Sequence, residues 1–205
     1  MRAVAGTAVR DAAERPNGTA PRVGALLDWP AQRRVGYLAM LALASAYTVV
    51  CALLAWRGVD PVPAPWVAIP ADSYYLWAIV FYGPALLAGW LLAAAVIQLW
   101  ARALGGTGAF EDLVPALGLA TALATLATLI PDLVMNVLGV YDGPWSKTWW
   151  GWSLAIGWMT AYVVLFFVLY PRAVRAVHGL TRARAVLVGV GGFVVYQGFI
   201  FVFIR

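Results

Sequence analysis

The sequence predicts an all-α integral membrane protein, folded as a bundle of five transmembrane helices. Of the 205 residues, 63% are hydrophobic and only 11% are charged, whereas soluble domains are about 45–50% apolar and about 25% charged. So few charged residues cannot cover the surface of a compact soluble domain of this size. The composition therefore excludes an ordinary soluble enzyme, a disordered chain and a collagen-like fibre.

Five apolar segments are long enough to cross a bilayer, which takes about 20 largely apolar residues in a helix. The expected spans are residues 35–56, 75–103, 113–138, 149–170 and 185–204. The runs are continuous and rich in Ala and Leu, which favours helices over the short alternating segments of a membrane β-barrel. We expect Pro171 to close the fourth span, because proline disrupts the interior of a helix.

Residues 1–28 lack the apolar core of a secretory signal peptide. We therefore expect these residues to form a flexible cytoplasmic tail, followed by a five-span membrane domain over residues 29–205. Neither a metal nor a cofactor is expected, since one histidine and one cysteine cannot build a zinc site.

The basic residues alternate from one connection to the next. Six of the 14 Lys and Arg residues precede the first span, Arg102 ends the second, and four lie between the fourth and fifth spans, which leaves three on the other side. Because basic residues concentrate on the cytoplasmic side, this pattern predicts a cytoplasmic amino end and an outside carboxyl end. The net charge of +5 is then explained by basic residues on the cytoplasmic side of the plasma membrane. No nucleic-acid partner is therefore expected.

The stretch between the fourth and fifth spans is the most basic connection. Near the membrane surface such charges are worth about 1 kcal/mol each against anionic lipids. We therefore expect this stretch to contact anionic headgroups, or alternatively a specific cytoplasmic partner. The residues concerned are Arg172, Arg175, His178, Arg182 and Arg184.

Asp132 is the only carboxylate placed well within an expected span, directly after Pro131 and one helical turn before Asn136. On insertion scales an acid at the helix centre costs about 2.5–3.5 kcal/mol, and less near the end of a span. One reading is an ion or proton site formed by Asp132, Asn136 and Gln197. The other is a hydrogen-bonded residue that reaches the outer interface or a polar group of another span.

Candidate polar partners of Asp132 in other spans are Gln197, Tyr196 and Tyr162. Small or hydroxyl-bearing residues at helical spacing predict packing contacts and local hydrogen bonds between or within spans. These residues are Ser153, Gly157 and Ala161 in the fourth span, with Ala116, Ala120, Ala124, Thr121, Thr125 and Thr128 in the third.

Three stretches flank the expected spans: Leu26–Pro30 lies before the first, Trp100–Asp112 lies around the connection of the second and third, and Val174–Ala185 lies around that of the fourth and fifth. In this order and placement they resemble the bacterial branch of the YIP-one (Ypt-interacting-protein) domain family. The resemblance covers nearly the whole chain and implies five spans, a cytoplasmic amino end and a short outward carboxyl end. Eukaryotic members bind prenylated Rab-type GTPases, but the resemblance implies no activity for a bacterial member.

These observations favour a non-enzymatic membrane protein that works by interaction, as a scaffold, an assembly factor or a bilayer-organising protein. Its expected partners are the lipid bilayer and a second membrane protein or a second copy of the chain. The alternative is a small proton- or cation-coupled transporter or channel that uses Asp132.

Overall fold

The computed structural model describes residues 29–59, 69–137 and 149–203, so the expected tail over residues 1–28 lies outside the described residues. Within these ranges the chain is helical and contains no strand. The elements are α2 (Trp29–Arg57), the short 3-10 helix η2 (Ala71–Ser73), α3 (Tyr74–Ala103), α4 (Phe110–Val137), α5 (Trp149–His178) and α6 (Arg182–Phe203). All five α-helices are long and apolar enough to cross a membrane, as predicted.

The helices agree with the expected spans, with one correction at the end of the fourth. Pro171 does not close α5, which continues to His178. The structure explains this through a neighbour: α6 presents Gly189 to Pro171, and a Cβ atom at Gly189 would lie 2.6 Å from the Pro171 nitrogen. Pro171 has no backbone N–H group to donate within α5. The close approach of α6 at this residue supports the helical backbone of α5 as it continues past Pro171.

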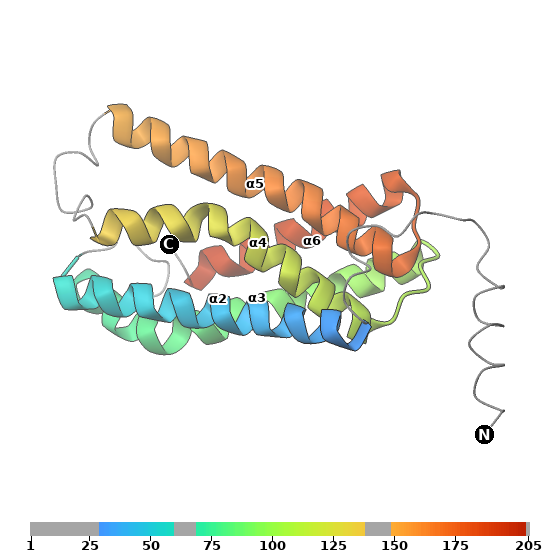
Figure 1. Cartoon of the computed structure of the whole chain (residues 1–205), viewed down its shortest axis with the longest axis horizontal. Coiled ribbons are helices and arrows are strands. Elements are labelled where there is room, and N and C mark those ends of the chain that lie inside the picture. Colours follow the sequence, from blue (N-terminus) through green and yellow to red (C-terminus); the bar gives the residue numbers. More distant parts are fainter. Residues whose placement is uncertain (1–28, 60–68, 138–148, 204–205) are drawn as a thin grey trace, which may run out of the picture.

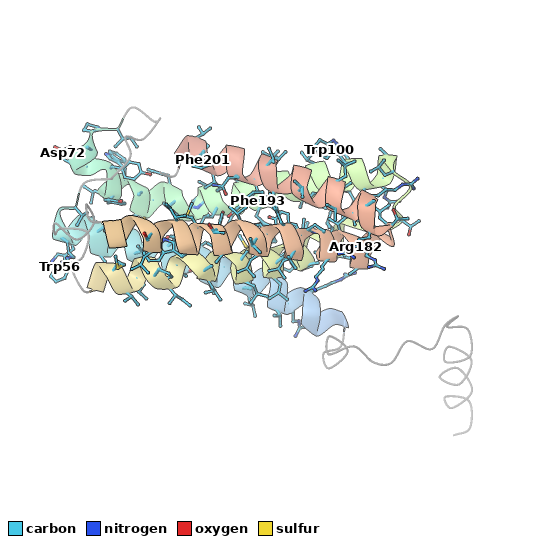
Figure 2. All side chains as sticks on the ribbon, turned by 90° about the horizontal axis from the view of Figure 1, so that it is seen from above. Trp56, Asp72, Trp100, Arg182, Phe193 and Phe201 are labelled. Carbon is cyan, nitrogen blue, oxygen red and sulfur yellow. The ribbon has the colours of Figure 1, made fainter. Side chains whose placement is uncertain are left out.

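The five helices form an elongated bundle in which neighbours follow the order α2, α3, α6, α5, α4 and back to α2 (Figure 1). The amino ends of α2, α4 and α6 meet the carboxyl ends of α3 and α5 at one end of the bundle. We call this the arginine end, because seven of the eight described arginines lie there: Arg33, Arg34, Arg102, Arg172, Arg175, Arg182 and Arg184. Figure 2 shows Arg182 and Trp100 toward this end, and Trp56 and Asp72 at the opposite end.

Contacts between connections hold the arginine end together. Arg33 of α2 forms an ion pair with Asp112 in the first turn of α4. The backbone N–H of Thr107 donates to the His178 carbonyl at 3.3 Å, and the Arg184 guanidinium donates to the Leu104 carbonyl at 3.0 Å. These contacts tie all five helices to one another at this end.

The closest helix–helix approaches also lie in this half of the bundle. At Gly36 of α2 an added Cβ would collide with the backbone carbonyl of Pro115 in α4, and Gly118 would in turn meet the Gly36 carbonyl at 2.8 Å. Because lipid provides no hydrophobic force between helices, such backbone approaches are a main source of packing energy in membranes. In α6, Gly189 approaches the backbone of Pro171 in α5, while Gly191 and Gly192 make room for the side chains of Trp100 and Ile97 in α3.

The half away from the arginine end is packed less closely, above all around α5. The most apolar stretch of α4 is 67% buried, whereas that of α5 is only 17% buried. In Figure 1, α5 diverges from α4 toward the opposite end. The packing predicted for α5 is therefore wrong at Gly157 and Ala161: both are exposed, and a Cβ at Gly157 would have no neighbour within 4 Å.

We predict that Gly36→Ala lowers the unfolding free energy of the detergent-solubilised protein by about 1–3 kcal/mol, because α2 and α4 must move apart. Gly157→Ala is the matched control in an equally helical setting. It should leave the unfolding free energy unchanged or raise it by up to about 1 kcal/mol, because alanine favours a helix more than glycine does and its Cβ atom contacts no neighbouring residue. Equal unfolding profiles for the two variants would contradict this packing.

Candidate functional site

The half of the bundle away from the arginine end contains a partly open cavity of about 450 Å³. It brings together Asp132 and Gln197, two of the residues singled out in the sequence, with the candidate partners Tyr162 and Tyr196. The remaining lining residues come from all five helices: Tyr47, Tyr82, Leu86, Thr125, Thr128, Met159, Ile200 and Phe201. Asn136 lies on α4, but its side chain is outside the described residues.

The seam between α5 and α6 forms one edge of the cavity, and it is closed on the arginine side. The two helices run antiparallel, so their contacts follow a fixed register. The rings of Phe166 and Phe193 lie with centroids 4.9 Å apart. One turn further from the arginine end, the Tyr162 hydroxyl donates to the Gln197 side-chain carbonyl at 2.8 Å. Gln197 therefore has a partner in α5, and this hydrogen bond joins the two helices across the seam.

Beyond that hydrogen bond the seam opens. Met159 of α5 and Phe201 of α6 occupy the next positions in the register, and they are 45% and 48% exposed. Both line the cavity, so they stand at its mouth. Phe201 lies two residues before the end of α6, and Asp132 lies five residues before the end of α4. Because a helix rises about 1.5 Å per residue, the mouth is close to the end of the bundle opposite the arginine end.

A ladder of threonine hydroxyls forms the α4 wall. Thr121, Thr125 and Thr128 donate to the carbonyls of Leu117, Thr121 and Thr125 at 2.8, 2.7 and 3.0 Å. The hydrogen bonds within this helix that the sequence predicted are thus confirmed. The Thr128 hydroxyl also bonds the Tyr47 hydroxyl of α2 at 3.1 Å. Satisfied hydroxyls can be held in an apolar bundle at little cost.

The cavity ends on a packed floor toward the arginine end. The Tyr170 hydroxyl of α5 and the Thr121 hydroxyl of α4 bond at 2.9 Å, and both side chains have no exposed surface. Leu117 and Phe166 are likewise fully buried at this level. Interiors packed in this way contain few voids larger than a water molecule, so the cavity is a dead end in this structure.

The lining combines aromatic and apolar groups with one charge. Among the described residues that line the cavity, Asp132 is the only charged side chain. Asp132 is partly buried and lies within electrostatic range of Tyr47 and Tyr82, whose rings stack with centroids 5.1 Å apart. The arrangement can hold a group of complementary charge next to an aromatic surface.

The sequence did not identify Tyr47, Tyr82 or Met159 as cavity residues. Each lies in an apolar run, where an isolated tyrosine or methionine carries no distinctive spacing. The sequence carries one weak signal, since Tyr47 and Tyr82 each place a polar hydroxyl inside an apolar span. Which helices bring them together depends on the packing order, and hydropathy alone does not contain that order.

The basic stretch divides into two kinds of residue. Arg172, Arg175, Arg182 and Arg184 are exposed, as contact with headgroups requires. His178 departs from that expectation: its side chain is only 2% exposed, and its ring packs where a Cβ at Gly106 would lie 3.0 Å from the Nδ1 atom. A headgroup cannot reach it, because the 105–108 turn covers it. Its carbonyl, which accepts from Thr107, serves instead to join two connections.

No protein-family model, curated protein or solved structure matches this chain. The resemblance to the YIP-one family therefore stays a prediction from the sequence.

The hydrogen bond at the cavity floor predicts that two variants lose different amounts of unfolding free energy. Thr121→Val leaves the buried Tyr170 hydroxyl without its partner, which costs about 1–3 kcal/mol of unfolding free energy. Tyr170→Phe costs less, about 1 kcal/mol, because the Thr121 hydroxyl keeps the Leu117 carbonyl. Unfolding titrations in mixed detergent micelles measure both values, and the reverse order would contradict the described floor.

Proposed function

We propose that this chain is a non-enzymatic, multi-pass membrane protein that binds a partner molecule in the cavity at Asp132. This binding role is the concrete form of the interaction function that the sequence favours, in a scaffold, assembly or bilayer-organising protein. One observation carries the proposal: Met159 and Phe201 line the cavity and are 45% and 48% exposed, whereas on its arginine side Thr121 and Tyr170 are fully buried and bonded to each other. A dead-end cavity suits binding, whereas conduction needs a continuous path.

The proposed orientation places the arginine end in the cytoplasm and the cavity mouth on the outer side of the plasma membrane. It is supported by the seven described arginines at one end and by the preference of basic residues for cytoplasmic connections. Exposed Trp56 and Trp77 near the opposite end, and Trp100 near the arginine end, fit the aromatic belts of a membrane protein. The resemblance to the bacterial branch of the YIP-one family implies the same orientation.

The exposed arginines at the arginine end are proposed to contact anionic headgroups. Arg172 and Arg175 occupy the last two turns of α5, and Arg182 begins α6. Basic groups at such positions gain about 1 kcal/mol each near an anionic surface. This interaction orients and anchors the bundle, and it does not need His178.

A second candidate function is proton- or cation-coupled transport. One observation favours it: a carboxylate, an amide and several hydroxyls from five helices line the same cavity. Intramembrane acids mark proton and ion pathways in many transporters. In that case the floor at Thr121 and Tyr170 would have to open during a transport cycle.

Reconstitution into liposomes separates the two functions. We expect proteoliposomes with a trapped pH indicator to show the same proton leak as protein-free liposomes under an imposed proton or sodium gradient. Transport would instead give a flux above this level that Asp132→Asn reduces to the protein-free value.

Asp72→Asn is the matched control for this experiment, because Asp72 is an exposed carboxylate of η2 outside the cavity. A flux lost in Asp132→Asn but retained in Asp72→Asn would overturn the binding proposal in favour of transport. The absence of flux in all three proteins would argue against transport.

A further inference from the structure

We propose that the ligand of this cavity is a neutral, flat, lipophilic molecule of the ketone or quinone type, whose carbonyl oxygen accepts hydrogen bonds from Tyr82, Tyr196 and Gln197. This ligand class rests on the proposed binding function and adds the chemistry of the bound molecule. Three properties of the cavity support it: the free hydrogen-bond donors of its wall, the lack of basic residues in its described lining, and its aromatic rings.

Three groups of the cavity wall can donate a hydrogen bond and have no partner among the described residues. The hydroxyls of Tyr47 and Tyr162 are used in hydrogen bonds to other side chains, whereas those of Tyr82 and Tyr196 are not. Gln197 accepts the Tyr162 hydroxyl through its side-chain carbonyl, so its amide N–H groups are still available. Because buried polar groups are almost always hydrogen-bonded, a ligand with an acceptor oxygen completes this wall.

These donors come from two helices that are neighbours in the bundle. Tyr196 and Gln197 are consecutive in α6, and Tyr82 belongs to α3, which packs against α6. Tyr47 lies within electrostatic range of both Tyr82 and Tyr196, so the two hydroxyls lie near the same side chain. A carbonyl oxygen has two lone pairs and can accept from two of these donors at once.

The charges of the lining give the ligand no net charge. Asp132 is the only charged side chain among the described lining residues, and it has an interaction of its own. No described lysine, arginine or histidine lines the cavity, so nothing in the described lining holds an anion. This disfavours a phospholipid, because its ester carbonyls lie only a few atoms from its phosphate.

The rings of the wall favour a flat, unsaturated body. Tyr47 and Tyr82 stack with centroids 5.1 Å apart and planes inclined by 22°, and aromatic faces of this kind pack well against another ring. Met159 and Phe201 at the mouth are apolar and about half exposed, so a lipophilic molecule can enter from the membrane. The cavity volume of about 450 Å³ is within the range of small-molecule sites, about 300–1,000 Å³.

Fluorenone and fluorene test the proposal, because both are flat and neutral and only fluorenone has a carbonyl oxygen. The purified full-length protein is placed in nanodiscs of an ether-linked phosphatidylcholine, a lipid without ester carbonyls. Binding is measured by equilibrium dialysis against empty nanodiscs. We expect saturable binding of fluorenone and at least about fivefold weaker binding of fluorene, the ratio that corresponds to about 1 kcal/mol for a typical hydrogen bond.

The double variant Tyr82→Phe, Tyr196→Phe removes both hydroxyls and keeps both rings. It should weaken fluorenone binding at least about fivefold and leave fluorene binding unchanged. Its unfolding temperature should match that of the parent, because neither hydroxyl has a partner among the described residues. Tyr37→Phe is the matched control, since Tyr37 is an exposed tyrosine of α2 outside the cavity, and it should bind both compounds as the parent does.

Equal binding of the two compounds, or unchanged fluorenone affinity in the double variant, overturns the carbonyl ligand. An equal loss of both compounds in that variant, or saturable binding of neither compound to the parent, also overturns it.

A second set of nanodiscs, made of an ester-linked phosphatidylcholine with chains of the same length, separates two sources of a carbonyl group. Equal fluorenone affinity in the two lipids supports a separate molecule as the ligand. An affinity at least about fivefold lower in the ester-linked lipid assigns the donors to the ester carbonyls of the bilayer and overturns the proposal. The proposed function itself fails on a different measurement, the Asp132-dependent flux across liposomes.

Discussion

The rest of the structure depends on one constraint, the close approach of helix backbones in the half of the bundle near the arginine end. Gly36 lies against the Pro115 backbone, and Gly189 lies against Pro171. In lipid, helices associate through such packing and through polar contacts, because burial of apolar surface offers little gain. The approaches bring α2 close to α4, and α6 close to α5, and the ion pair of Arg33 with Asp112 joins α2 to α4 at the same end.

The opposite half lacks this restraint, and the cavity is the consequence. Gly157 and Gly198, the glycines that α5 and α6 place there, have no neighbour within 4 Å of an added Cβ. The seam between the two helices closes as far as the hydrogen bond of Tyr162 with Gln197 and then separates. Asp132 lies in the space that results, where a partly buried carboxylate is tolerated because the end of the bundle is near.

The sequence predicts the helices well, because span length and apolarity follow from bilayer thickness alone. It misplaces the end of α5 because Pro171 is supported by Gly189, a residue of another helix. The same limit affects the site. Asp132 and Gln197 stand out as rare polar residues in apolar runs, and the structure places both at one cavity.

The spacing of small residues was a poor guide to packing in α5 but a good one in α4. Gly157 and Ala161 face outward, whereas Ala120 and Ala124 are buried. Both stripes have the same period, so only the arrangement of the neighbouring helices distinguishes them. Tyr47 and Tyr82 were missed for the same reason, since their contribution to the cavity depends on which helices are adjacent.

Sided access to the cavity tests the central claim most directly. In a Cys51→Ala background, which removes the one native thiol, Gln197→Cys and Thr121→Cys are exposed to a small, charged, membrane-impermeant methanethiosulfonate. A one-ended cavity facing outward predicts that Gln197→Cys reacts in intact cells and not in inside-out vesicles, while Thr121→Cys reacts in neither. Modification of Gln197→Cys from the cytoplasmic side, or rapid modification of Thr121→Cys, would contradict it.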